Sequence, residues 1–405
     1  MKFIEGGVCA AKGFKASGVI AGIKKNNTTK KDVALIVSDV RAAAAATYTT
    51  NLVKGAPLTV TKNHIADGYA QAVICNSGNA NTCNANGIEI AEGICALVEK
   101  ALGIPASDVV VASTGVIGQP LNLSPVEKCM EALTAGLSEN GSSDAAAAIM
   151  TTDTKQKSVS VEFELGGKTC RMGGIAKGSG MIHPNMATML VFITTDAAVS
   201  PKMLQKALSS DIPNTFNMVS VDGDTSTNDM VTVLANGLAG NPEITEDNAD
   251  FKIFMKALNS VTMGLCRMIA GDGEGATKLL ECVVSGAPDE KTGKIVAKSI
   301  ICSSLTKAAM FGADANWGRV LCAIGYSGAA VDVTKIGVAF KSAKGTVKVC
   351  ENGAGVPFSE ELAKEILLES EIDILVDLGM GDQTVTAWGC DLTYDYVKIN
   401  GDYRT

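Results

Sequence analysis

The feature that most constrains the fold is an alternation of strand and helix patterns that runs along the chain without a linker. Apolar runs such as Val33–Val37 and Val109–Ala112 predict buried strands, and apolar residues at helical spacing predict a helix from Ile90 to Leu102. The sequence contains no internal repeat and no low-complexity tract. Segments of this kind bury their apolar faces by packing sheets against helices. We therefore predict a mixed α/β fold with sheets and helices interleaved.

The remaining predicted elements extend this alternation to the C-terminus. Two helices begin at serine-proline pairs, Ser124-Pro125 and Ser200-Pro201, where serine can be the N-cap and proline suits the first helical position. The other predicted strands and helices are Val73–Cys75, Ser158–Leu165, Thr169–Ile175, Thr277–Ser285, Ile372–Val376 and Thr384–Asp391 for strands, and Asp144–Met150, Glu246–Ile269 and Ser359–Leu368 for helices.

Composition and charge narrow the class of protein. The 405 residues are 46% hydrophobic, which is enough for two or three structural units, and the formal net charge is -8. No basic run or basic-aromatic stripe occurs, so we expect no nucleic-acid partner. The N-terminus has no signal-peptide pattern, and no apolar run approaches the ~18 residues of a membrane helix. We therefore expect a cytoplasmic protein without a membrane partner.

Cysteine and histidine usage argues against disulfides and metal sites. Twelve cysteines occur without a CxxC pair, mostly in apolar segments, as for Cys95, Cys266 and Cys322. In a chain with no export signal, this pattern predicts reduced, buried thiols. The two histidines, His64 and His183, are too few for a histidine-rich metal site, and they exclude a histidine-based triad unless His183 serves. We expect no metal and no cofactor.

Thr188 stands behind a glycine-rich loop and the small residue Ala187, and a solid apolar run follows it. A hydroxyl attacks a carbonyl only when a base takes its proton. The α-amine of a chain-terminal threonine is such a base, since its reference pKa is ~7.7–8.0 and it lies on the same residue. Thr188 could acquire that amine by attacking the Ala187 carbonyl, which shifts the peptide to an ester that water releases. The alternative is a structural threonine at a strand start, and only neighbouring motifs decide between the two.

The segment Ser113–Gly115 lies where a predicted strand ends. A strand end followed by Thr-Gly presents a hydroxyl and a backbone N–H towards one point. Such donors can form an oxyanion hole, which stabilises a transition state by ~3–4 kcal/mol per donor. The alternative is an ordinary turn from strand to loop.

Two acidic loops resemble ligand-binding motifs only in part. In Val221–Asp229, oxygen-bearing side chains occupy alternate positions, at Asp222, Asp224, Ser226 and Asn228. Thr227 and Val233 stand where a calcium loop needs glycine and glutamate, so we expect a tight hydrogen-bonded loop. The segment Gly271–Lys278 lacks the preceding strand of a dinucleotide fingerprint. Its Glu274 is a carboxylate on a glycine loop, placed either to meet a cationic substrate group or simply to be solvated.

Seven motifs in order over nearly the whole chain together resemble one family, the glutamate N-acetyltransferases, or ornithine acetyltransferases, of arginine biosynthesis. The most specific is KGSGMIHPNMATML at 177–190, and no matched position departs from the family pattern, although the C-terminal tail matches less distinctly. The other motifs are TTN with AP at 49–57, NSGNANTC at 76–83, ASTGVIG at 112–118, SVDGDTSTND at 220–229, GDGEGATK at 271–278 and FGADANWGR at 311–319.

The resemblance implies a precursor that cuts itself between Ala187 and Thr188. The products would be an α chain of residues 1–187, carrying the oxyanion hole, and a β chain of residues 188–405, beginning with the nucleophile; they would reassemble as an α2β2 heterotetramer. It also implies an α/β fold of the α+β type, with two β layers sandwiched between helices. The implied catalytic residues are Thr188 with the oxyanion pair Thr114 and Gly115, and the implied substrate-binding residues are Thr151, Lys177, Thr188, Glu274, Asn400 and Thr405.

The implied reaction transfers the acetyl group of N2-acetyl-L-ornithine to L-glutamate through an acetyl-Thr188 ester, in a ping-pong mechanism without metal or cofactor. Glu274 would suit the ornithine ammonium group, and Lys177 a substrate carboxylate. The sequence leaves open whether acetyl-CoA is a second donor and whether arginine inhibits the enzyme. Two alternatives remain: an autoprocessed aminopeptidase or amidase of similar architecture, and an inactive binding or assembly protein on the same fold.

Overall fold

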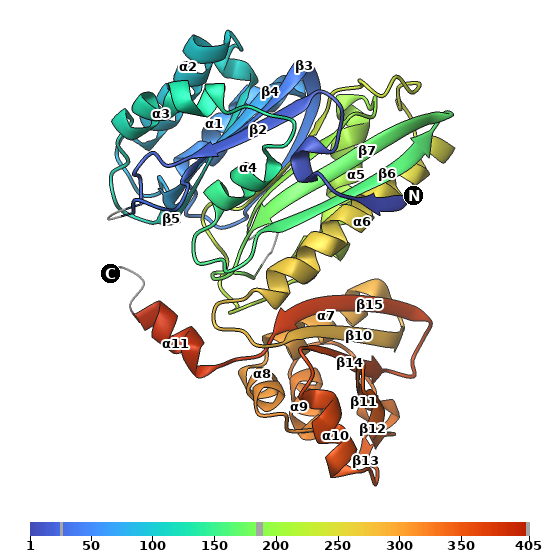
Figure 1. The fold of residues 1–405 in the computed structure, drawn as a ribbon. Helices are drawn as coiled ribbons and strands as arrows, with labels where there is room; N and C mark the ends of the chain where they lie inside the picture. The colour runs from blue at the N-terminus through green and yellow to red at the C-terminus, as the bar shows by residue number, and fades with distance from the viewer. Residues whose placement is uncertain (25–26, 184–188, 402–405) are drawn as a thin grey trace. The chain divides into compact units, whose positions relative to one another are not determined.

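The computed structural model describes residues 1–24, 27–183 and 189–401, which form two compact units. The first unit takes in the described residues of Met1–Gly178, Pro184–Phe216 and Thr225–Leu265. The second takes in Ser179–His183, Asn217–Asp224 and the described residues from Cys266 onward. Figure 1 shows the elements of both units in chain order.

A mixed sheet forms the centre of the first unit. Among the described residues it has nine strands in the order β1-β6-β7-β8-β9-β3-β4-β5, with β2 paired to β3. Most neighbours are antiparallel, but the pairs β8–β9 and β4–β5 are parallel. The strands are β1 (Lys2–Ile4), β2 (Phe14–Val19), β3 (Val33–Tyr48), β4 (Tyr69–Asn79), β5 (Val109–Val116), β6 (Lys157–Leu165), β7 (Lys168–Lys177), β8 (Leu190–Thr195) and β9 (Met230–Ala235).

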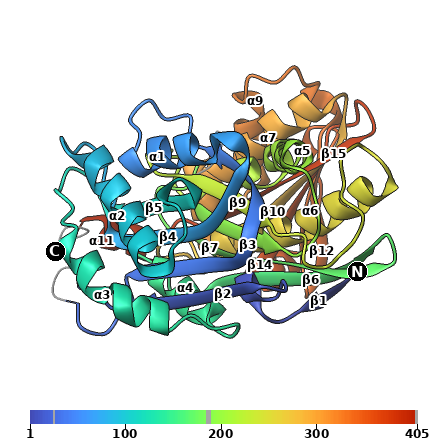
Figure 2. The same ribbon diagram turned by 90° about the horizontal axis from the view of Figure 1, so that it is seen from above.

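Helices cover both faces of this sheet, so its strands are largely apolar on both sides. Helix α4 (Ser142–Ile149) packs on β2, β3, β4 and β7 with its alanine face. Helices α1 (Ala56–His64), α2 (Gly87–Leu102) and α3 (Ser124–Ala135) share a second apolar core with β3, β4 and β5. Figure 2 shows these three helices gathered beside β4 and β5. Helix α5 (Pro201–Asp211) packs on β3 and β9.

Strands β8 and β9 occupy the middle of the sheet although they follow position 188 in the sequence. Every residue of both strands is buried, as expected for strands covered on both faces. Strand β7 pairs with β8 on one side, and β3 pairs with β9 on the other. The sheet is therefore built from interleaved segments of residues 1–187 and 188–405.

The second unit contains a smaller sheet with its own helices. Among the described residues its six strands run in the order β13-β12-β11-β14-β10-β15. Helix α7 (Glu290–Cys302) packs on β10 and β15, and α10 (Glu360–Leu367) packs on β11 and β12. The other elements are α8 (Ser304–Phe311), α9 (Trp317–Gly325), α11 (Tyr394–Gly401), β10 (Leu279–Ala287), β11 (Gly337–Ser342), β12 (Gly345–Glu351), β13 (Ala354–Gly355), β14 (Glu371–Asp377) and β15 (Gln383–Cys390).

The expectation of a mixed α/β chain with two sheets and covering helices is confirmed. Two local expectations are corrected. Strand β5 continues through Ser113–Gly115 to Val116, because pairing with β4 resumes beyond an irregularity there. Ser124 is the first helical residue of α3 and not its N-cap, which is Leu123. The predicted cut at 187/188 divides the sequence, whereas the compact units are discontinuous in sequence.

The cysteine expectation is correct in part. Each of the twelve cysteines, all within the described residues, is a free thiol. Eight are buried, but Cys83 and Cys322 are exposed, and Cys9 and Cys302 are half-buried. Cys322 lies on the amphipathic helix α9, whose apolar sequence made it look internal.

Helix α6 (Ala249–Gly271) is long and apolar enough to cross a membrane by length and composition alone, which corrects the expectation that no segment approaches this limit. Half of its most apolar window is buried within the protein. Phe254, Leu258 and Val261 are fully buried. We interpret α6 as a core helix, since a core helix of this length passes the same test.

Candidate active site

Thr114 and Gly115 lie near the end of β5, beside the end of the parallel strand β4. Gly115 has φ 129°, a backbone conformation that favours glycine. A Cβ at this position would lie 2.6 Å from the Asn79 nitrogen and even closer to the Gly78 carbonyl carbon. The register of the β4–β5 pair shifts at Gly78 and Asn79. The predicted oxyanion pair, Thr114 and Gly115, is therefore held in an irregular strand end, and only glycine fits at position 115.

Asn228 connects this strand end to the entrance of β9. Its side chain is 5% exposed, and its Nδ2 donates to the carbonyl oxygens of Ser113 at 2.9 Å and Ala80 at 2.6 Å. The Thr82 hydroxyl donates to Asn228 Oδ1 at 2.6 Å. The tight hydrogen-bonded loop expected for Val221–Asp229 is thus confirmed for this residue. Sequence reasoning missed the link itself; the only signal was a polar Thr-Asn-Asp run placed directly before a mostly apolar strand.

The strand register also places Lys177 at the entrance of β8. Lys177 is opposite Leu190, and Leu190 is opposite Met230. The Met230 N–H donates to the Met189 carbonyl oxygen at 2.9 Å, so Met189 is fixed beside the start of β9. Thr188 precedes Met189 in the sequence, but Ala187 and Thr188 lie outside the described residues. Within the first unit, strand register therefore places Lys177 beside the start of β8, and Asn228 links the strand end of Thr114 and Gly115 to the residues just before β9.

The predicted binding residue Thr151 lies in the turn between α4 and β6, and Asp153 organises that turn. The Asp153 carboxylate accepts from the Thr151 N–H at 3.0 Å and from the Gly178 N–H at 2.7 Å. Lys157 Nζ donates to the same carboxylate at 2.7 Å. Burial alone would raise the pKa of the Asp153 carboxyl, but the charges of Lys177 and Lys157 outweigh it and hold this pKa well below its ordinary value.

Asp229 is a second buried acid in this region, and its pKa is shifted in the opposite direction from that of Asp153. It is 2% exposed, and burial raises the pKa of its carboxyl well above the ordinary value despite the charge of Lys177. Its Oδ2 has no hydrogen-bond partner among the described residues. We infer that Asp229 is neutral while Asp153 is ionised. The group therefore contains two lysines, Lys157 and Lys177, and one carboxyl whose ionised form is favoured, a formal excess of positive charge that suits an anionic ligand.

In the second unit, Glu274 and Asn400 lie together as the resemblance implied. Asn400 Nδ2 donates to Glu274 Oε2 at 2.7 Å, and Glu274 is only 7% exposed. The Glu274 N–H donates to the Ser179 carbonyl oxygen at 2.9 Å, and a Cβ at Gly180 would collide with the Glu274 carboxylate. Glu274 is therefore not a solvated loop acid. Thr405 lies outside the described residues.

His183 is engaged in hydrogen bonds within the second unit. Its Nδ1 lies 3.1 Å from Ser220 Oγ and 3.5 Å from Cys302 Sγ. Burial, and next the charge of Lys298, lowers the pKa of His183 to about 4. The imidazole is thus neutral at neutral pH. The Asp222 carboxylate accepts from the backbone N–H groups of Met181 and Ile182, the two residues before His183, which supports a loop-shaping role for His183.

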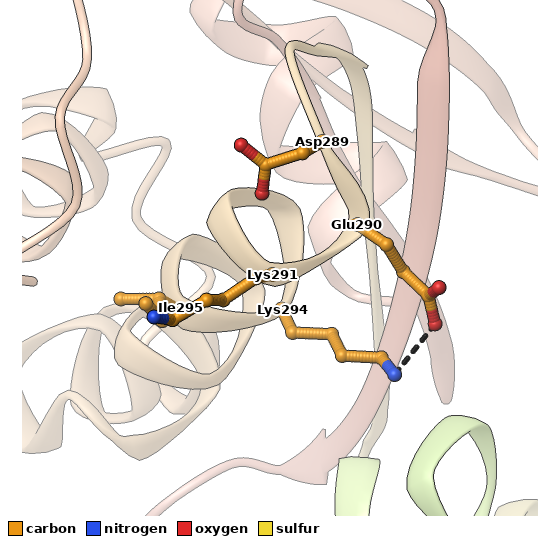
Figure 3. Close-up of a pocket in the computed structure, with 5 residues that line it drawn as sticks. All are labelled: Asp289, Glu290, Lys291, Lys294 and Ile295. Carbon is orange, nitrogen blue, oxygen red and sulfur yellow. Dashed lines mark ion pairs between the residues drawn. The ribbon is translucent and has the colours of Figure 1, made fainter.

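A surface hollow of ≈ 570 Å³ lies at the start of α7 (Figure 3). It is lined by Asp289, Glu290, Lys291, Lys294 and Ile295. Glu290 and Lys294 pair at 2.6 Å, and Asp289 caps the helix by accepting from the Thr292 N–H. None of the predicted site residues lines this hollow, so we assign it no role in catalysis.

Comparisons with known proteins agree with the resemblance. A sequence model described as the ArgJ family matches residues 15–405. The chain is 53% identical over 406 residues to the "arginine biosynthesis bifunctional protein ArgJ" of Caldanaerobacter subterraneus subsp. tengcongensis, covering 100% of both chains. It is 50% identical to ArgJ 1 of Clostridium acetobutylicum, covering 97% of this chain and 96% of the relative. The solved structure of the same-named protein from Bacillus halodurans is 48% identical with a TM-score of 0.51, over 53% of this chain and 99% of the solved chain.

Proposed function

Because this chain belongs to the ArgJ family, we propose that it transfers the acetyl group of N2-acetyl-L-ornithine to L-glutamate in arginine biosynthesis. The observation that carries the proposal is the junction of β5 with the entrance of β8 and β9. There Asn228 joins the strand end of Thr114 and Gly115 to the strand pair that begins at Leu190 and Met230. The proposed nucleophile, Thr188, is the residue before Met189 in the sequence.

In the first half-reaction, Thr188 Oγ attacks the acetyl carbonyl carbon of acetylornithine. The α-amine of Thr188 takes the hydroxyl proton, and Thr114 and Gly115 donate hydrogen bonds to the oxyanion. The C–N bond then breaks, and the proton passes from the amine to the leaving nitrogen of ornithine. The acetyl group remains on Thr188 as an ester.

In the second half-reaction, the amino nitrogen of glutamate attacks the ester carbonyl. Its proton passes through the Thr188 amine to Thr188 Oγ as the C–O bond breaks, so N-acetylglutamate leaves and the hydroxyl is restored. Lys177 and Thr151 bind the substrate carboxylate, which the net positive charge around Lys177 supports. Glu274, with Asn400 and Thr405, binds the ornithine ammonium group. No metal or cofactor takes part.

The active enzyme is made by self-cleavage between Ala187 and Thr188, which frees the α-amine. The size of the Bacillus halodurans solved chain supports this: it corresponds to 53% of this chain, and residues 188–405 are 218 of 405 residues, just over half. The topology supports continued association of the two products. Strands β8 and β9 lie between β7 and β3, so separating the products would break the central sheet.

The relatives' description as bifunctional supports a second activity. We propose acetyl-CoA as a second acetyl donor for glutamate, entering the same acetyl-Thr188 ester. We also propose that the mature protein is an α2β2 heterotetramer in the cytoplasm, where its twelve thiols stay reduced.

Denaturing electrophoresis of the purified protein tests self-cleavage, and an assay with glutamate tests the transfer. Two fragments of similar mass are expected, and N-terminal sequencing of the second should read TMLVF. Thr188→Ala should stay full length and inactive, because it lacks the hydroxyl that both cleaves the Ala187–Thr188 peptide bond and carries the acetyl group. Acetylornithine and acetyl-CoA are offered separately. Transfer of acetyl to water in place of glutamate would favour the amidase alternative, and a single uncleaved wild-type band would refute the mechanism.

A further inference from the structure

Asp153 and Lys157 form an ion pair in which both side chains are completely buried, at 0% exposure each. The pair joins the turn before β6 to the first residue of β6. Removing two charges from water is costly, and replacing such a pair by apolar residues is often neutral or stabilising. Stability alone therefore does not explain a buried pair at this position.

The hydrogen bonds of Asp153 point to a different explanation. Besides Lys157, its carboxylate accepts from the N–H of Thr151 and from the N–H of Gly178, the residue that follows Lys177. One carboxylate thus fixes the backbone at both Thr151 and the end of β7. A second contact fixes the same turn from the other side, since Lys24 Nζ donates to the Met150 carbonyl oxygen at 2.9 Å.

Because Lys157 neutralises the Asp153 carboxylate, this carboxylate can lie close to Lys177 without neutralising the Lys177 charge. A single Asp153–Lys177 pair would carry no net charge and would attract an anionic substrate only weakly. With Lys157 at 2.7 Å from Asp153, the three groups together keep one net positive charge. The arrangement leaves a cation of fixed position for an incoming anion.

We propose that Asp153 is the positioning residue of the substrate-carboxylate site: through the N–H groups of Thr151 and Gly178 it sets the spacing between Thr151 and Lys177, and Lys157 balances its charge. This inference rests on the proposed function, because Thr151 and Lys177 are the binding residues named there. It assigns no contact between Asp153 and the substrate.

Asp153→Asn tests the proposal, because the amide keeps the shape but presents an NH₂ group and loses the charge. Steady-state kinetics are measured per cleaved enzyme, varying acetylornithine and glutamate in turn. We expect KM to rise about 10- to 100-fold for both substrates, the scale of a displaced charge-assisted contact, with kcat nearly unchanged. The matched control is Asp144→Asn, which removes the carboxylate of an exposed ion pair with Lys31 in the same unit and should leave KM unchanged.

A donor without a carboxylate separates positioning from general destabilisation. N-acetylputrescine is acetylornithine lacking its carboxyl group, so wild type and Asp153→Asn should use it with equal kcat/KM. If the single variant does not fold, Asp153→Asn/Lys157→Met removes both members of the buried pair, keeps the formal net charge of the group, and should show the same KM pattern. An unchanged KM, an equal loss with N-acetylputrescine, or failure of both variants to self-cleave would overturn the proposal. A wild-type enzyme without acetyl transfer would instead refute the proposed function and this inference with it.

Discussion

Replacing Gly115 by alanine should abolish most of the acetyl transfer by distorting the oxyanion hole. The new Cβ would lie 2.6 Å from the Asn79 nitrogen, with Gly78 nearer still, whereas ordinary contacts start near 3.4 Å, so backbone must move by about 1 Å. A displacement of about 1 Å in a reacting site can cost ~10²-fold, and loss of one oxyanion donor costs ~10²–10³-fold in kcat. We therefore expect kcat to fall by ~10²–10³-fold with KM little changed.

Gly118→Ala is the matched control for this experiment. Gly118 also has a left-handed backbone, with φ 75°, but no heavy atom lies within 4 Å of its added Cβ. It should therefore suffer backbone strain of about 1 kcal/mol without a displaced neighbour, and kcat should stay close to that of wild type. Both variants are assayed for kcat per cleaved enzyme and for Tm. Equal losses of kcat in the two variants, or a Gly115→Ala enzyme with near-wild-type kcat, would refute the oxyanion assignment.

The remaining predictions concern Glu274 and His183. Glu274→Gln keeps the shape of the side chain and an oxygen that can accept from Asn400 but removes the charge, so kcat/KM for acetylornithine should fall roughly 10- to 150-fold while self-cleavage is spared. The control is Asp224→Asn, which changes an exposed acid of the same unit. A Glu274→Gln protein that binds acetylornithine normally but does not cleave itself would contradict this role. His183→Ala should self-cleave and keep most of its kcat, and a loss of ~10³-fold would identify a base instead. Because the folded pKa of His183 is lowered to about 4, its contribution to stability is present above about pH 6.5 and is lost as pH falls towards 4. The Tm of His183→Ala should therefore fall less than that of wild type between pH 7 and pH 5, and parallel Tm curves would show that this histidine does not titrate as described.

The sequence by itself determined the family, the mixed α/β class and most strand positions, because apolar runs and helical spacing are local properties. It also singled out Thr114, Gly115, Lys177 and Glu274, since their motifs are contiguous in the chain. The region of α7 to β12 was not predicted, because its short amphipathic segments acquire their order only against the second sheet.

Only the tertiary structure decided how distant segments meet. That β8 and β9 enter the sheet between β7 and β3 depends on strand pairing over long sequence separations, which no local pattern encodes. The roles of Asn228 and Asp153 come from bonds to backbone groups far away in the sequence, at Ser113 and Gly178. The opposite pKa shifts of the two aspartates are likewise a property of the packed interior. Burial raises the pKa of Asp229, whereas at Asp153 the charges of Lys177 and Lys157 outweigh burial and lower the pKa, although both are the same residue type in the sequence.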